Sequence, residues 1–470
     1  MATAFLNAPR WMTAAAATAV IGASLGFTVA VAELNAVILA FALLACVFVL
    51  IDFRVGVVLL IVLMPVSATS VFPHGMLGVT GLNPLNLLLL ATLGSYLLRA
   101  LADGSVARFV PPPLLWLYIV PIVIAGALGS RHLAEIPPYF FESKLVQYDG
   151  VGSYIRDMVV KPLFMVVFAL LVGVGVSNAR DPERFLVPIL VSIWVAAPVV
   201  LVFFAQSGAG LDELASSQSR HFLSPLGVHA NELGRLYVMA YALLLFTWAA
   251  TEQRKVVLLA SMGVVVAALA ITFSRGAFVG FVLVNALFLV SRRSTGAFVL
   301  GAFLVAGLLF VLPAAFYDRL ATGFGGDLDG ISAGRINGLW LPLLPEVWRS
   351  PIYGNGIDST VWSDAMRTGR ILEASHPHNA YLQALLDMGV AGLILLCAYF
   401  AHVWKGFRRL SVDPSVSPIL QGFYAGAGAG LASWLISLVT DSSLAPRPEQ
   451  AFLWLAIGMM YGQNARKRAV

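Results

Sequence analysis

A polar segment with two histidines stands at the start of an apolar run near the C-terminal end of the chain. The segment covers 375–383 and reads SHPHNAYLQ. Pro377 is placed to open a helix, so His378 is expected in its first turn, where the helix dipole disfavours the imidazolium form. A neutral ring can accept a proton, and this pattern therefore predicts a general base. A plainer interpretation stays open, in which His378 and Asn379 only cap a helix at the bilayer surface.

The residues that follow suggest how such a histidine could be held in place. On a wheel of 100° per residue, His378, Leu385, Gly389 and Gly392 fall on one side of the expected helix. Small residues allow helices in a membrane to approach closely. We therefore expect this face to pack against a neighbouring helix and to fix His378 near the water boundary.

Two arginines are expected at the same surface as the histidine. Arg275, in the sequence SRGAF, lies at a tight junction between two apolar runs, and Arg335 follows Gly334 in a long polar segment. Guanidinium groups bind phosphate oxygens in a bidentate manner, so two arginines and a neutral histidine would suit a donor that carries a pyrophosphate. The alternative is that both arginines contact lipid headgroups from the interface.

Other polar residues within or beside apolar runs have less specific explanations. Glu232 and Arg235 are three residues apart, so they can neutralise one another on a helix or line the site. Asp387 would lie about 13 Å along the helix from His378 and could bond to another helix or touch the substrate. The acid pair in DLDG at 327–330 is too short a pattern to assign a metal.

The composition identifies the class of protein that must position these residues. Of the 470 residues 59% are hydrophobic and only 11% are charged, far fewer charges than in a soluble domain. We expect an all-α, polytopic membrane protein with about 12–14 transmembrane helices. The first apolar run, Thr13 to Val31, is interpreted as an uncleaved helix. The two cysteines exclude a disulfide framework, and the net charge of +5 is not gathered into a patch for nucleic acid.

The distribution of basic residues predicts the orientation. Both termini are expected in the cytoplasm, since Arg275 and Arg447 are then the only exceptions to the positive-inside rule among the short loops. Three longer segments, 129–161, 206–228 and 317–377, are expected outside, and the last could form a small cap.

Taken together, these motifs resemble those of a known family. His378-Asn379, nine residues, Gly389, two residues and Gly392 are similar to the signature of the O-antigen ligase family, whose domain is shared with many O-antigen and exopolysaccharide polymerases. The resemblance extends from about Phe185 to Trp454. Further similar positions are Ser274-Arg275-Gly276-Ala277, Gly334-Arg335, Trp340, Pro351, Gly354 and Gly356.

The resemblance implies an activity and roles for particular residues. It implies a membrane glycosyltransferase of the GT-C type that inverts the anomeric centre and needs no metal or other cofactor. The donor would be a glycan on undecaprenyl pyrophosphate at the periplasmic face of the bacterial inner membrane. His378 would deprotonate the acceptor hydroxyl, and Arg275 and Arg335 would hold the pyrophosphate. Possible supporting residues are His376, which is a second candidate for the substrate-facing ring, Asn379, Arg235, Glu232 and Asp387.

The acceptor and the domain division remain expectations. Residues 1–180 are expected to form N-terminal transmembrane helices, and 181–470 a ligase-like region that includes the periplasmic segment 317–377. A ligase would transfer the glycan to lipid A-core or a similar acceptor, whereas a polymerase would use a second lipid-linked repeat. A flippase or transporter of lipid-linked sugars is a third interpretation, but it predicts charges along a central path rather than on the outer side. The expected partners are the donor, the acceptor and membrane lipids, with no nucleic acid.

Overall fold

The architecture of the chain is helical. The computed structural model describes residues 34–67, 69–72, 75–76, 79–80, 83–104, 109–143, 145–146, 148–208, 223, 225–292, 295–311, 317, 329, 332, 334–371, 374–440 and 444–469. Within these residues the only strands are β1 (Gly75–Met76) and β2 (Val79–Thr80), which form a short antiparallel ladder. The all-α class expected from the sequence is thus confirmed.

The helices follow the apolar runs of the sequence. The first half contains α2 (Leu34–Ile51), α3 (Phe53–Leu63), α4 (Pro84–Ala102), α5 (Pro112–Leu114), α6 (Val120–Gly129), α7 (Tyr139–Glu142), α8 (Val151–Ile155), α9 (Lys161–Ser177) and α10 (Leu186–Ser207). The second half contains α12 (Ala230–Ala250), α13 (Lys255–Ile271), α14 (Arg275–Arg292), α15 (Thr295–Val311), α18 (Leu341–Arg349), α19 (Asp364–Arg367), α20 (Ala380–Ser411), α21 (Pro418–Ser437) and α22 (Ala451–Ala469). Leu115–Ile119, Arg156–Val160 and Ile336–Trp340 are π-helical, and short 3₁₀ turns cover Leu133–Glu135, Pro182–Phe185, Ser359–Trp362, Leu438–Thr440 and Pro448–Gln450.

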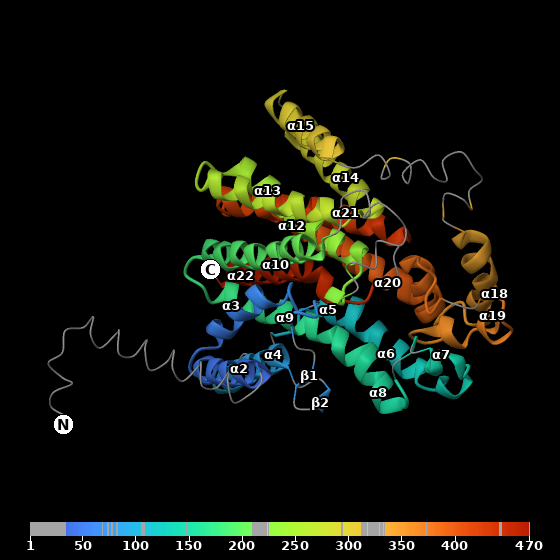
Figure 1. Cartoon of the computed structure of the whole chain (residues 1–470). Coiled ribbons are helices and arrows are strands. Elements are labelled where there is room, and N and C mark those ends of the chain that lie inside the picture. The colour runs from blue at the N-terminus through green and yellow to red at the C-terminus, as the bar shows by residue number, and fades with distance from the viewer. Residues whose placement is uncertain are drawn as a thin grey trace.

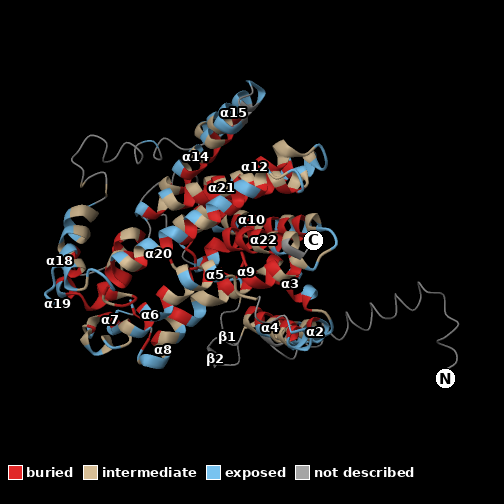
Figure 2. Cartoon of the chain, turned by 180° about the vertical axis from the view of Figure 1, so that it is seen from behind, coloured by how far each residue is buried: buried red, intermediate tan, exposed pale blue. Residues whose placement is uncertain are grey.

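Seven of the described helical segments are long and apolar enough to cross a membrane. They are 84–102, 112–129, 151–177, 182–207, 230–250, 380–411 and 418–440, and shorter apolar helices accompany them. Figure 2 shows the buried residues concentrated in the central helices, whereas α15 is largely exposed. Its exposed side chains are apolar, as Phe303 and Phe310 illustrate, which is the pattern of a lipid-facing surface. The chain is therefore a multi-pass membrane protein, and the first predicted span, 13–31, lies outside the described residues.

Glycines allow α12 and α21 to pack with their backbones nearly in contact. Gly422, Gly426 and Gly430 are spaced four apart on α21. A Cβ atom on Gly426 would lie 2.4 Å from the carbonyl oxygen of Ala242. Small residues at this spacing permit the close helix packing that stabilises membrane bundles. This interface fixes α12, whose first turn carries Glu232, relative to the C-terminal helices.

A cap lies at one end of the bundle and has a hydrophobic core of its own. We define the cap as residues 130–155 and 339–371; its core side chains include Phe140, Val361 and Trp362. Figure 1 shows α7, α18 and α19 together at this end, whereas the C-terminus lies at the other. The described parts of the first and third segments expected outside the membrane therefore lie together in the cap, and most of the second lies outside the described residues.

The helix after the histidines is interrupted at Gly389. This glycine has φ 64° and ψ −170°, a conformation that only glycine adopts readily. Here the backbone meets residues 351–356, as Val390 N donates to Pro351 O at 2.8 Å and Gly356 N donates to Asp387 O at 2.9 Å. The prediction of one continuous helix with a small-residue face is wrong. Gly389 lies where the backbone of residues 351–356 contacts α20, and its conformation there is not helical.

Candidate functional site

The two histidines lie in a turn that immediately precedes α20. Asn379 is the N-cap, and its side-chain oxygen accepts hydrogen bonds from the backbone N–H groups of Tyr381 and Leu382, both at 3.1 Å. The helix therefore begins at Ala380, and the expectation that His378 lies in its first turn is wrong. His378 instead has a φ of 50°, in the left-handed region. Asn379 satisfies the helix end, and His378 stands just outside it.

Neighbouring groups hold the turn in place. Trp340 Nε1 donates to Pro377 O at 2.8 Å, which ties the turn to the cap. The rings of His376 and His378 meet edge to face with centroids 4.2 Å apart. Ser375 Oγ lies 3.1 Å from His376 Nδ1. Both candidate rings are thus brought to one place.

The electrostatic surroundings keep His376 neutral. Burial, followed by His378, Arg447 and Arg335, lowers the pKa of His376 to about 3. Two arginines therefore lie close enough to this turn to oppose a positive charge on His376. Since a ring with so low a pKa is a poor proton acceptor at neutral pH, His376 is the weaker candidate for a base.

Arg335 reaches this turn from the long segment before α18. Gly334, with φ 77°, turns the chain immediately before it, and Arg335 N donates a hydrogen bond to Ser332 Oγ at 3.1 Å. One guanidinium nitrogen, Nη1, donates to Thr440 O at 3.3 Å. Arg335 thus connects the segment before the cap helices to the chain that follows α21.

The start of α12 supplies acidic and basic groups. His229 is the N-cap; its Nδ1 accepts from Asn231 N at 3.2 Å, and Glu232 Oε2 accepts from His229 N at 3.1 Å. Glu232 Oε1 lies 3.7 Å from Arg447 Nη1. The capping geometry turns Glu232 toward its own N-cap and toward Arg447, and the pairing of Glu232 with Arg235 stays a prediction.

Arg275 is the first residue of α14 and lies next to this start of α12. The connection from α13 is tight, as predicted, with Phe273 at φ 46°. Ser274 Oγ donates to Asn231 Oδ1 at 2.8 Å. A Cβ atom on Gly234 would lie 2.4 Å from Ala277 Cβ, so the two helix starts are in close contact. Arg275 is therefore at the same end of the bundle as Glu232.

Two functional candidates were missed by the sequence analysis. Arg447 lies between α21 and α22; besides its contact with Glu232 it lowers the pKa of His376 and opposes the burial that raises the pKa of Asp358 to about 6. Glu449, only 7% exposed, follows two residues later. Burial and the neighbouring Glu232 raise its pKa, while Arg447 and Arg235 act in the opposite direction. The only sequence signal was that Arg447 broke the positive-inside rule.

Asp387 stands apart from the histidine turn. It is buried, and its Oδ1 accepts hydrogen bonds from Ser359 N at 3.0 Å and Ser359 Oγ at 2.8 Å. These contacts hold the cap against α20 where the helix is interrupted. Asp387 therefore contributes to positioning the cap, and its contacts favour the structural alternative that the sequence left open.

The assembled site has the elements of a phosphate-handling transfer centre. The histidine turn, Arg335, Arg447 and the Glu232–Glu449 pair come from four separate segments, and Arg275 begins a fifth. No set of three His, Cys, Asp or Glu side chains within the described ranges converges as a metal site would require. The cationic groups are the ones suited to an anionic leaving group, and His378 is suited to accept a proton.

A family model matches part of the chain. Residues 260–397 match the family model described as O-antigen ligase. The match includes Arg275, Arg335 and His378 and falls within the region of resemblance. No curated protein matches the chain.

Proposed function

We propose that the chain transfers a glycan from undecaprenyl pyrophosphate to an acceptor hydroxyl, because residues 260–397 match the family model described as O-antigen ligase. The chain is a membrane glycosyltransferase of the O-antigen ligase or polymerase type. The proposed reaction takes place at the cap end, on the periplasmic side of the bacterial inner membrane. The observation that carries the proposal is the convergence of His378, Arg335 and Arg447 at one turn, at the same end of the bundle as the start of α14.

In the proposed mechanism His378 takes the proton of the acceptor hydroxyl. The acceptor oxygen then forms a bond to the anomeric carbon on the face opposite the donor linkage, so the configuration inverts. The bond from the anomeric carbon to the pyrophosphate oxygen breaks, and its electron pair stays on that oxygen. Arg275 and Arg335 neutralise the charge that develops, which is the role that guanidinium forks fill best.

The positions of the groups support a catalytic region at 181–470. The histidine turn, the four arginines 235, 275, 335 and 447, and both glutamates belong to it. The cap that covers them also uses residues 130–155, so the expected N-terminal part contributes to the outer surface.

The proposal is tested by transfer with purified protein in detergent. The reaction contains a polyprenyl-pyrophosphate-linked glycan, with and without lipid A-core, and His378→Asn is the control. A single addition that needs lipid A-core identifies a ligase, and a ladder from the donor alone identifies a polymerase. If no product depends on His378, the enzyme proposal is wrong and a transporter becomes the better explanation.

The arginines give a second test of the same reaction. Arg275→Lys and Arg335→Lys keep the charge but lose the planar fork, so both variants should lose most transfer activity. The donor should be varied to separate its KM from kcat. Normal activity in either variant removes that arginine from the mechanism.

A further inference from the structure

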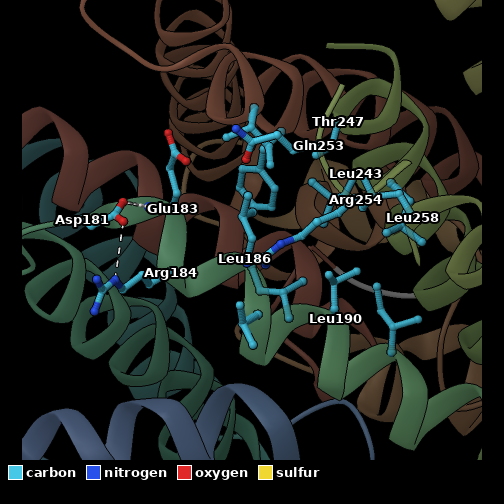
Figure 3. A pocket seen from close by; sticks show the side chains of 16 residues that line it. Asp181, Glu183, Arg184, Leu186, Leu190, Leu243, Thr247, Gln253, Arg254 and Leu258 are labelled. Carbon is cyan, nitrogen blue, oxygen red and sulfur yellow. Dashed lines mark hydrogen bonds and ion pairs between the residues drawn. The ribbon is translucent and has the colours of Figure 1, made fainter. Parts of the chain in front are cut away.

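A cavity of about 270 Å³ lies at the end of the bundle opposite the cap. Figure 3 shows it between the starts of α10 and α13 and the last turns of α12. Its volume is close to the lower limit for small-molecule sites. The cavity is lined by Asp181, Glu183, Arg184, Leu186, Val187, Ile189, Leu190, Ile193, Leu243, Leu244, Thr247, Gln253, Arg254, Leu258, Ile419 and Phe423.

The body of the cavity is apolar. Leu243 on α12, Leu258 on α13 and Phe423 on α21 are almost completely buried and form its walls. Leu186 and Leu190 complete it from α10. Aliphatic and aromatic walls between membrane helices favour a hydrocarbon chain, and the volume limits that chain to part of one acyl tail.

The rim carries an arginine with an unusual backbone. Arg254 has a φ of 56°, a left-handed conformation that residues other than glycine seldom adopt. In Figure 3 its side chain extends across the cavity above Leu186. In the part of the chain that the structure describes, its guanidinium has no hydrogen bond or ion pair, whereas the neighbouring Lys255 lies 2.8 Å from Glu252.

The first turn of α13 adds donors at the same place. Arg254 is the N-cap of this helix, and no side chain caps it. The first N–H groups of a helix lack acceptors within it, and they attract anions together with the helix dipole. The exposed guanidinium of Arg254 stands at the rim of the apolar cavity next to this helix start, and together they fit a phosphate group attached to a hydrocarbon.

An acidic side chain on the rim narrows the class of ligand. Glu183 lines the cavity, and its carboxylate makes no ion pair in the described residues, while the nearby Asp181 lies 3.5 Å from Arg184 Nε. A carboxylate beside a phosphate site repels a purely anionic headgroup. It accepts hydrogen bonds from an ammonium group, so the rim is complementary to a headgroup of both charges.

We propose that this cavity binds a phospholipid with a primary ammonium headgroup, such as phosphatidylethanolamine. The phosphate lies on Arg254 and the first amides of α13, the ammonium faces Glu183, and one acyl chain enters between α10, α12, α13 and α21. The bound lipid joins the ends of four helices. Two of them, α12 and α13, lead to Glu232 and to the Arg275 junction at the cap end. The proposal does not depend on the transfer reaction.

The test measures lipids that remain on the purified protein by native mass spectrometry. The protein is delipidated and then exposed to vesicles of phosphatidylethanolamine, phosphatidylglycerol or phosphatidylcholine. We expect retention of phosphatidylethanolamine at least several-fold above the other two, and about a tenfold loss of it in Arg254→Ala. Arg254→Asn provides a second variant, since asparagine tolerates the left-handed conformation without the guanidinium.

Matched variants separate this site from general surface charge. Lys255→Ala removes an adjacent, already paired cation and should leave retention unchanged. Glu183→Gln should abolish the preference for phosphatidylethanolamine over phosphatidylcholine, because the amide cannot pair with the ammonium. Equal retention in wild type and Arg254→Asn, or phosphatidylglycerol bound as well as phosphatidylethanolamine, overturns the proposal.

Discussion

Among the described residues, two left-handed residues precede helices at opposite ends of the bundle and offer a comparison. His378, with φ 50°, precedes α20 at the cap end, and Arg254, with φ 56°, precedes α13 at the other end. The start of α20 is capped by the Asn379 side chain, whereas no side chain caps α13. In both places a residue with a left-handed backbone stands at the start of a helix. Only at α13 are the first backbone amides left without a side-chain cap.

The difference indicates two kinds of site. At α20 the Asn379 side chain caps the helix end. The groups available for chemistry there are the imidazole of His378 and arginines that come from other segments. In the proposed lipid site at α13, the backbone amides and Arg254 together bind one phosphate. The histidine turn is therefore expected to work through its side chains.

The largest expected effect is the loss of the imidazole at position 378. His378→Asn should lower the transfer rate by about 10²- to 10⁴-fold, the usual contribution of a general base. Asparagine also adopts the left-handed conformation, so the turn should persist. His132→Asn is the matched control, because His132 stacks on Trp362 within the cap with ring centroids 5.7 Å apart. Activity of His378→Asn within a few-fold of wild type would contradict the role of base.

The second effect concerns the arginine that the sequence analysis missed. Arg447→Ala should reduce transfer by about tenfold to hundredfold, the usual range for one hydrogen bond to a charged group. Arg447→Lys should restore only part of this loss. Arg367→Ala serves as the control, since Arg367 Nη1 lies 3.1 Å from Glu135 in the cap. Steady-state rates at several donor concentrations are the measurement, and equal losses in both alanine variants would deny Arg447 a specific role.

The third effect is the response of stability to acid. Since the pKa of His376 is lowered to about 3 in the folded protein, the unfolded chain binds its proton first as the pH falls below about 6.5. Stability from this residue should therefore decrease by roughly 1.4 kcal/mol per pH unit between pH 6 and 4. His378, Arg335 and Arg447 are the groups that disfavour the proton.

Thermal unfolding in detergent at several pH values measures this slope. His376→Gln should lose less stability on acidification than wild type. Asp358 and Glu449, whose pKa values are raised by burial, contribute in the opposite direction in both proteins. Identical pH profiles for wild type and variant would show that His376 titrates normally.

The smallest effect is that of the helix cap. Asn379→Ala should lower the free energy of unfolding by about 1 kcal/mol, because two backbone N–H groups lose their acceptor. Asn379→Asp retains an acceptor and should remain close to wild type. Urea or thermal unfolding of the two variants measures the change in the free energy of unfolding. If Asn379→Ala leaves the free energy of unfolding unchanged, the N-cap does not stabilise the turn, and the proposed difference from the start of α13 is wrong.

The sequence established the features that depend on local composition. Apolar runs predicted the helical membrane class, and SRGA predicted the tight junction before Arg275, because hydropathy and turn chemistry act over a few residues. The same local reasoning failed at Pro377 and Gly389. It treated the histidine and the glycines as parts of one regular helix, whereas the contact of residues 351–356 with 386–391 requires a break there.

What only the tertiary structure decided is which charges meet. Glu232 could pair with Arg235 by spacing alone, but the packing of α12 against the segment before α22 places Arg447 beside it. The hydrogen bond from Arg335 to Thr440 O likewise joins segments far apart in the chain. Charge interactions depend on distance in space, and helix packing sets that distance between segments far apart in the chain. The sequence by itself determined a membrane bundle with a reactive histidine segment, and the packing determined the groups around it.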